Sequence, residues 1–102
     1  MDSIYEALSD LKDASDNNCW IDVSASWGNS PSIAALFEYF EFHERKILLW
    51  KGNRNDGILP PYSLQFDLPE GCNVTKARMD DEFYCEFTTD AFYCCVHIYP
   101  KI

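Results

Sequence analysis

The chain has 102 residues, 47% of them hydrophobic and 16% aromatic, and its seventeen acidic residues against eight basic ones give a formal net charge of −9. A disordered acidic segment lacks the aromatic and apolar residues that build a core, so this composition excludes that class and indicates a folded domain with a strongly negative surface. The length is typical of one domain, which we predict to span residues 1–102.

Residues 3–16 have the pattern of an amphipathic helix. Ser3 is a plausible N-cap, and Glu6 three residues later completes a capping-box sequence. At about 100° per residue, the apolar and acidic residues of this segment separate onto two faces. The apolar face consists of Ile4, Ala7, Leu8, Leu11 and Ala14, and the acidic face of Asp2, Glu6, Asp10 and Asp13. We expect the apolar face to pack on a sheet.

Residues 19–27 alternate strictly, which predicts a half-buried strand. One face carries Cys19, Ile21, Val23, Ala25 and Trp27, and the other carries Trp20, Asp22, Ser24 and Ser26. Gly28–Pro31 then ends the strand. The next segment, residues 33–43, is ambiguous, because its apolar spacing fits a helix while its dense aromatic run over 37–42 favours a strand. We favour strands at 35–43 and 46–51, joined by a turn at His43–Arg45.

Turn residues and prolines indicate a loop over residues 52–61. Residues 62–68 alternate again and predict a strand, which a turn at Pro69–Gly71 follows. The C-terminal third indicates a hairpin of residues 83–87 and 92–99 with a two-residue turn at Thr89-Asp90. This turn would place three pairs opposite each other, namely Phe87 with Phe92, Cys85 with Cys94, and Phe83 with Val96.

The predicted elements together indicate an α+β fold, in which an N-terminal amphipathic helix packs on an antiparallel β-sheet of about five or six strands. The second face of the C-terminal hairpin would carry Tyr84, Glu86, Tyr93, Cys95, His97 and Tyr99. Trp20, Tyr84, Tyr93 and Tyr99 are therefore expected to be exposed aromatic residues.

The cysteines do not form a metal-binding or disulfide motif. Their number is odd and none are spaced as C-x-x-C, so we interpret them as reduced thiols that fill the core. They are Cys19, Cys72, Cys85, Cys94 and Cys95. A zinc site at Cys94, Cys95 and His97 is disfavoured because adjacent strand residues point to opposite faces. We predict no metal and no cofactor.

Catalysis by this chain is also disfavoured. Cys95 and His97 are the best candidates for a nucleophile and its base, but strand neighbours two residues apart point in parallel rather than converge. No phosphate-binding, dinucleotide-binding or metalloprotease motif is present. We therefore expect a protein that is not an enzyme.

The basic residues do not predict a nucleic-acid site. The nearest approach to a basic patch is Arg45, Lys46, Lys51 and Arg54, whereas a stacking site needs a basic groove beside its aromatic rings. We interpret these four as charges that keep a hairpin edge soluble. The apolar stretches are far too short to cross a bilayer, and the N-terminus lacks a signal-peptide pattern, so we expect a cytoplasmic protein with no membrane partner.

Acidic clusters are the remaining candidates for a functional surface. Acidic residues recur at every third position from Glu38 to Glu44, and three more precede the C-terminal hairpin. Carboxylates around aromatic anchors form a surface that binds a basic protein. The predicted partner-binding residues are Glu38, Glu41, Glu44, Asp80, Asp81, Glu82, Tyr84 and Trp20.

In size, charge and compactness the chain resembles the cognate immunity proteins of bacterial toxin–immunity systems. The resemblance implies an inhibitor that occupies the basic substrate cleft of a toxin domain, with a nuclease as the expected toxin. One alternative is a phage-type inhibitor, similar to anti-CRISPR proteins, whose carboxylates mimic a nucleic-acid backbone. Another is a regulatory or assembly subunit that docks through an apolar face. An aromatic-centred acidic patch would favour immunity, and an even spread of acids over one face would favour mimicry.

Overall fold

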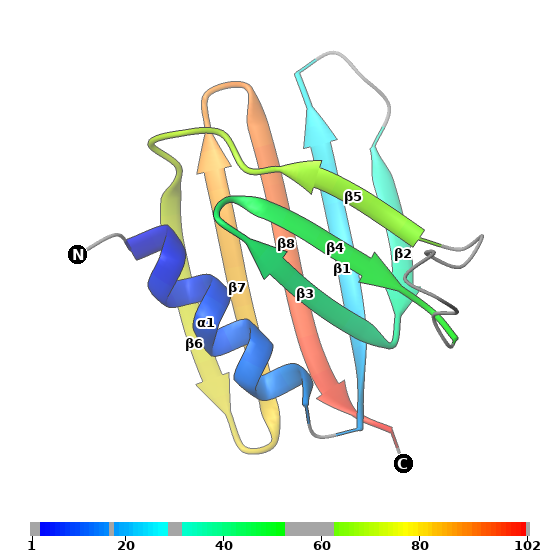
Figure 1. The fold of residues 1–102 in the computed structure, drawn as a ribbon. Coiled ribbons are helices and arrows are strands. Elements are labelled where there is room, and N and C mark those ends of the chain that lie inside the picture. The colour runs from blue at the N-terminus through cyan, green and yellow to red at the C-terminus, as the bar shows by residue number, and fades with distance from the viewer. Residues whose placement is uncertain (1–2, 17, 29–31, 53–62, 102) are drawn as a thin grey trace.

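The computed structural model describes residues 3–16, 18–28, 32–52 and 63–101. One helix and eight strands lie within this part of the chain (Figure 1). The helix α1 spans Ser3–Ser15, and the strands are β1 (Cys19–Trp27), β2 (Ile33–Phe37), β3 (Tyr39–His43), β4 (Lys46–Trp50), β5 (Ser63–Asp67), β6 (Asn73–Met79), β7 (Glu82–Thr89) and β8 (Phe92–Pro100).

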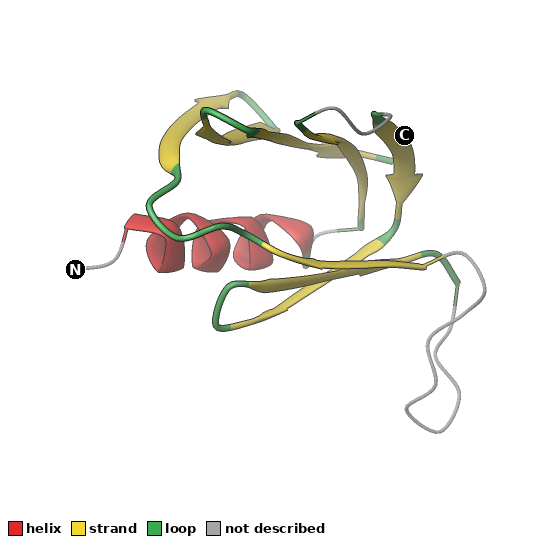
Figure 2. Cartoon of the chain, turned by 90° about the horizontal axis from the view of Figure 1, so that it is seen from above, coloured by secondary structure: helices red, strands yellow, loops and turns green. Residues whose placement is uncertain are grey.

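The strands form two antiparallel sheets. The large sheet has the order β2-β1-β8-β7-β6, and the small sheet has the order β3-β4-β5. The longest pairing joins β1 to β8, from Cys19 opposite Pro100 to Trp27 opposite Phe92. Figure 2 shows that α1 and the small sheet lie on the same side of the large sheet. The other side of the large sheet is not covered by any described element.

The core lies between the large sheet and the layer formed by α1 and the small sheet. Ala7, Leu8 and Leu11 of α1 are fully buried, as the apolar stripe of the helix predicts. On the large sheet the buried residues alternate with more exposed ones along β1, β7 and β8. They include Ile21, Val23, Phe83, Cys85, Phe87, Cys94, Val96 and Ile98. Burying each large apolar side chain contributes about 1.5–3 kcal/mol to stability, so this interface determines how the layers stack.

The small sheet and the helix close the core from the second layer. Phe40, Ile47 and Leu49 of the small sheet are buried. Phe42 contacts Tyr5 of α1 in an edge-to-face arrangement with 5.7 Å between the ring centroids. Four cysteines are buried free thiols, and Cys95 is partly buried. Burial raises the pKa of Cys85 and of Cys94 to about 12, so these two thiols stay protonated at neutral pH.

The structure confirms the α+β class and the N-terminal helix, but it corrects the number of strands. Eight strands in two sheets replace the predicted five or six in one sheet. The segment 35–43 is extended as favoured, yet it divides at Glu38 into β2 and β3, which belong to different sheets. The strand β6 was not predicted, because most of its residues are polar and exposed. The predicted loop 52–61 lies outside the described residues from position 53 onwards.

The predicted pairing of the C-terminal hairpin was wrong by two residues. Thr89 lies opposite Phe92, so the turn is Asp90-Ala91 rather than Thr89-Asp90. Phe87 therefore faces Cys94, and Phe83 faces Ile98. A shift by two keeps every side chain on its predicted face, because side chains alternate with a period of two. Alternation alone could not distinguish the two registers.

Candidate partner-binding site

The side of the large sheet that faces away from α1 and the small sheet is the candidate site, and we call it the open face. Its side chains occupy the positions between the core residues of each strand. The members on the three central strands are Trp20, Asp22, Ser24 and Ser26 of β1, Tyr93, Cys95, His97 and Tyr99 of β8, and Glu82, Tyr84, Glu86 and Thr88 of β7. This surface therefore combines carboxylates, hydroxyl groups and aromatic rings.

Two neighbouring rows of side chains cross the middle of the open face. Asp22 lies opposite His97, which lies opposite Tyr84. In the adjacent row Cys95 lies between Ser24 and Glu86. Cross-strand neighbours on one face have Cβ atoms about 5 Å apart, so these residues form one continuous patch.

Hydrogen bonds fix two of the carboxylates of the open face. His97 Nε2 lies 2.6 Å from Glu82 Oε1, and the carboxylate can only accept, so this nitrogen carries the proton. The Tyr84 hydroxyl donates a hydrogen bond to the carboxylate of Glu86. That hydrogen bond, together with burial, raises the pKa of Tyr84, which remains a neutral donor.

The three central strands give this patch a negative charge. Asp22, Glu82 and Glu86 supply three carboxylates, while the residues of β1, β7 and β8 that share this face include no lysine or arginine. The acidic stripe of α1 is different, because Lys76 Nζ lies 3.3 Å from Glu6 Oε1 and 3.0 Å from Asp10 Oδ2. Two carboxylates of the helix thus have a lysine partner, whereas Asp22, Glu82 and Glu86 have none on β1, β7 and β8.

Cys95 and His97 are neighbours two positions apart on the open face. His97 Nε2 is hydrogen-bonded to Glu82. Burial raises the pKa of the Cys95 thiol, which disfavours the reactive thiolate. Among the described residues, no group of three or more His, Cys, Asp and Glu side chains is placed to hold a metal ion.

The structure distributes the eight predicted partner-binding residues over three regions. Trp20, Glu82 and Tyr84 share the open face. Asp80 and Asp81 form the turn between β6 and β7, at the end of the large sheet. The remaining three, Glu38, Glu41 and Glu44, belong to the segment from β2 to the β3–β4 turn.

Glu38 has a structural partner within the chain. Its carboxylate accepts hydrogen bonds from Lys101 Nζ at 2.5 Å and from the Gly52 backbone N–H at 3.2 Å. The hydrogen bond from Lys101 lowers the pKa of Glu38 below its ordinary value. Glu41 is exposed on the outer side of the small sheet, and Glu44 is exposed in the β3–β4 turn. The spacing of three residues therefore does not produce one acidic cluster.

Trp20 lies at the edge of the open face beneath two cations. Lys101 Nζ is 4.6 Å from its ring centroid, and Lys51 Nζ is 5.5 Å away. Cation–π attraction holds both ammonium groups over the ring. Trp20 therefore connects the open face to the end of β8 and to the end of the small sheet.

Asp22, Glu86 and His97 also lie on the open face but are not among the predicted contact residues. The alternation placed all three on the correct faces of their strands, so the signal was present. Candidates were chosen from clusters along the chain, whereas this patch forms across strands, between residues as far apart as 22 and 97.

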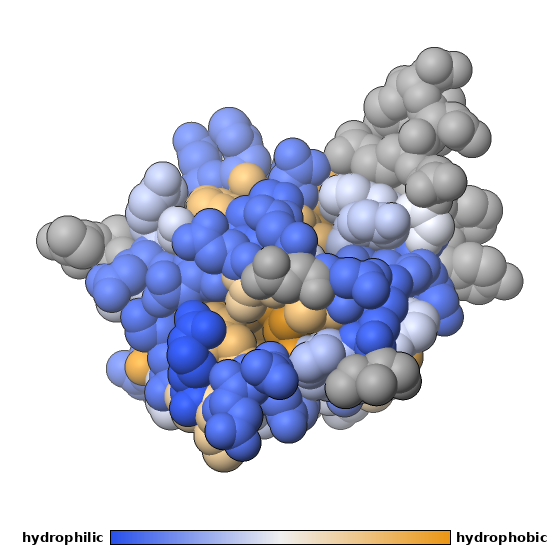
Figure 3. Space-filling model, turned by 90° about the horizontal axis from the view of Figure 1, so that it is seen from below, coloured by the Kyte–Doolittle hydropathy of each residue, from blue (hydrophilic) through white to orange (hydrophobic). Residues whose placement is uncertain are grey.

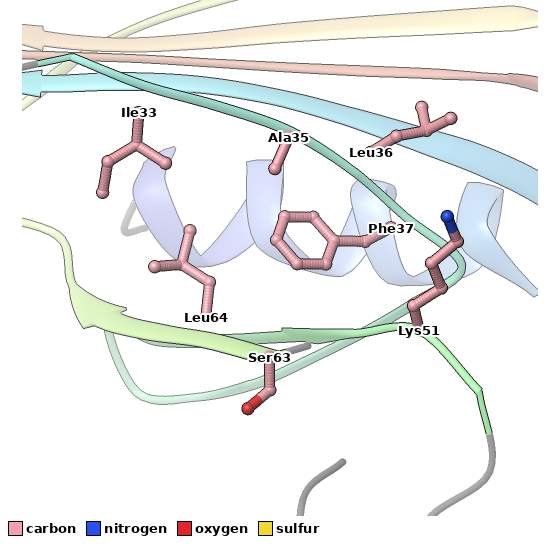
Figure 4. Close-up of a pocket in the computed structure, with 7 residues that line it drawn as sticks. All are labelled: Ile33, Ala35, Leu36, Phe37, Lys51, Ser63 and Leu64. Atoms are coloured by element: carbon pink, nitrogen blue, oxygen red, sulfur yellow. The ribbon is translucent and has the colours of Figure 1, made fainter. Parts of the chain in front are cut away.

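Two hollows lie away from the centre of the open face. Figure 3 shows apolar surface among hydrophilic residues at the lower end of the molecule. A hollow of about 440 Å³ at that end is lined by Ala14, Cys19, Arg78, Asp80, Asp81, Phe83, Ile98 and Pro100. A second, of about 550 Å³, lies between β2 and β5 and is lined mainly by apolar side chains (Figure 4).

The chain matches no protein-family model, and neither a curated protein nor a solved structure shows significant similarity to it. No described helix has both the length and the apolar composition to span a bilayer.

Proposed function

We propose that this protein is a non-enzymatic inhibitor that binds a basic partner protein, and that it acts as an immunity protein against a bacterial toxin domain, with a nuclease as the expected toxin. The observation that carries the proposal is the open face, where three carboxylates lie among tyrosine and histidine rings on a sheet face that no described element covers. A nuclease binds its substrate in a basic cleft, which such a surface complements.

The composition of the open face favours a protein partner over mimicry of a nucleic-acid backbone. Mimicry requires carboxylates spread evenly over one surface, whereas here Tyr84, Tyr93 and Tyr99 lie among them. Tyrosine is enriched in the energetically dominant centres of protein interfaces because it buries a large ring and still donates a hydrogen bond. The aromatic rings would anchor the complex, and the carboxylates would determine orientation and the association rate.

A rigid sheet also suits an inhibitor. The contact residues are carried by β1, β8 and β7, whose alternate residues form the buried core. Their backbones are therefore ordered before binding, which reduces the entropy lost in forming a complex. The proposal requires no catalytic step, and burial raises the pKa of the Cys95 thiol, which disfavours the reactive thiolate.

The test uses a purified basic toxin domain encoded beside the gene for this chain. Its nuclease activity and its affinity for this protein are measured with wild-type protein and with the triple variant Asp22→Asn, Glu82→Gln, Glu86→Gln. We expect wild-type protein to abolish the activity and the triple variant to bind at least about 10-fold more weakly, mainly through slower association at low salt.

The matched control is the triple variant Asp13→Asn, Asp67→Asn, Glu70→Gln, which loses the same charge at exposed positions away from the open face. It should inhibit as wild type does. Equal weakening by both variants would mean that only net charge matters, and would contradict a site on the open face. Binding that is insensitive to salt and to both variants would favour the regulatory-subunit alternative.

A further inference from the structure

The strand β2 is an edge strand of the large sheet. Within the described residues it pairs only with β1, so one side of its backbone has no strand partner. Its sequence, Ile33-Ala34-Ala35-Leu36-Phe37, has no charged residue and no proline. Exposed edges are usually blocked by charges, prolines or covering elements, because free backbone groups recruit another strand.

The edge at the other end of the large sheet is protected in these ways. The strand β6 carries Lys76 and Arg78. Lys76 forms ion pairs with the acidic face of α1, and the Arg78 guanidinium lies 4.9 Å from the ring centroid of Phe83. Within the described part of the chain, β2 therefore lacks the charged side chains that protect β6.

The residue order of β2 is complementary to itself. If two copies pair antiparallel about Ala35, Ala35 meets its counterpart and Ile33 meets Phe37 on one side of the sheet. On the other side Ala34 meets Leu36. Small residues thus meet at the centre and large apolar residues flank them, as two-fold symmetric interfaces require. No like charges come face to face within these five residues.

The cavity between the sheets supplies apolar surface for such a contact. Ile33, Ala35 and Phe37 of β2 and Leu64 of β5 point into a cavity of about 550 Å³ (Figure 4). Ile33, Ala35 and Leu64 remain partly exposed there. Antiparallel pairing of β2 would bring the same side chains of a second copy over this opening, so that two cavities close against each other.

Carboxylates close to the β2 edge do not prevent two copies from pairing there. The nearest carboxylate in sequence, Glu38, is hydrogen-bonded to Lys101, and Lys51 lines the cavity. Glu82 and Glu86 belong to β7, and Asp22 belongs to β1, so the β2 strands of both copies would lie between Asp22 and its counterpart. The repulsion between two chains of charge −9 therefore acts at a distance and is screened by salt.

We infer that the edge of β2 is a dimerisation site, through which a second copy of this chain pairs antiparallel and extends the two five-stranded sheets into one continuous sheet. The two-fold axis of such a pairing is perpendicular to the sheet, so both open faces lie on the same side of the dimer. This inference does not depend on the proposed function.

The test is sedimentation velocity of the wild-type chain and of two matched variants at protomer concentrations up to about 100 μM, where an edge contact of micromolar Kd assembles. Ala34→Lys places a charge on the β2 edge, and Ala77→Lys makes the same change on β6, where Ala77 is also exposed on the open face. We expect the wild-type chain and Ala77→Lys to sediment as dimers and Ala34→Lys as a monomer. Circular dichroism checks that each variant is folded.

A wild-type chain that stays monomeric over this range would overturn the inference. So would a dimer that survives Ala34→Lys, or one that Ala77→Lys disrupts, because either result would place the contact elsewhere.

Discussion

Glu44 adopts a backbone conformation that its side chain disfavours. It is the first residue of the β3–β4 turn and has a φ of 56°, in the left-handed region. Asn18 and Asp80 have φ values of 55° and 52°, but their short polar side chains tolerate this region. Sequence reasoning located a turn at His43–Arg45 although it lacks glycine and asparagine. The strain at Glu44 is the physical consequence of that composition.

Relief of this strain gives a prediction at the residue scale. Glu44→Gly should raise the free energy of unfolding by about 0.5 kcal/mol. The left-handed conformation strains glutamate by about 1 kcal/mol, and this strain exceeds the entropic cost of the more flexible unfolded chain that glycine gives. Urea denaturation measures the change. Glu44→Val, with a β-branched side chain at the same φ, should lower the stability, and a gain from valine would contradict this explanation.

At the scale of elements, the sequence predicted on which face of a strand each side chain lies more reliably than which strands pair. The alternation along 19–27 and 92–99 identified which side chains enter the core, because the period of two is a local property of a strand. It could not show that β1 pairs with β8 or that β2 and β3 separate into two sheets, since these depend on packing between distant segments. The strand β6 was not predicted because two of its core-side positions are charged. Lys76 there pairs with the acidic residues of α1, and Arg78 lies over the ring of Phe83.

The same distinction explains the outcome for the candidate site. Trp20 and Tyr84 were predicted as aromatic anchors and Glu82 as part of an acidic run, and all three lie on the open face. Asp22 and His97 could be joined to them only through strand pairing, which brings residues 22 and 97 opposite each other. A surface that forms across strands has no signature in the spacing along any one of them.

The hydrogen bonds of Glu38 connect three elements and make stability depend on pH. Its folded-state pKa is lowered chiefly by the hydrogen bond from Lys101, so its contribution is present above the unfolded pKa and is lost as pH falls through the folded pKa. Glu38→Gln should therefore lower the free energy of unfolding by about 0.5–1 kcal/mol at pH 7. The deficit should disappear in acid, below the folded pKa of Glu38. Thermal melts at both pH values measure the difference.

A control for this prediction is Glu70→Gln. Glu70 also forms an ion pair, with Arg45 at 3.3 Å, but its side chain is 84% exposed, so solvent screens the pair. This variant should change the stability little at either pH. A deficit for Glu38→Gln that persists unchanged into acid would mean that shape rather than charge explains its effect.

At the scale of the whole molecule, the net charge of −9 acts against compactness and against self-association. Added sodium chloride should therefore raise the melting temperature and strengthen the dimer through β2, since it screens repulsion between like charges. The same salt should weaken binding of a basic partner, for which the carboxylates of the open face attract opposite charge. Melting curves, sedimentation and binding assays across one salt series measure these three effects. The melting temperature and the dimer affinity should rise with salt while the affinity for the basic partner falls. A change in the same direction in all three would contradict the proposal that the open face binds a basic partner.

The strict alternation along β1, β7 and β8 has an evolutionary consequence. Every second residue of these strands belongs to the core and the residues between belong to the open face, so the core and the proposed recognition surface occupy interleaved positions of the same segments. A lineage under pressure to match a changing partner can exchange Asp22, Tyr84 or Glu86 while Ile21, Cys85 and Val96 keep the fold intact. The proposed recognition surface can therefore change without loss of the fold.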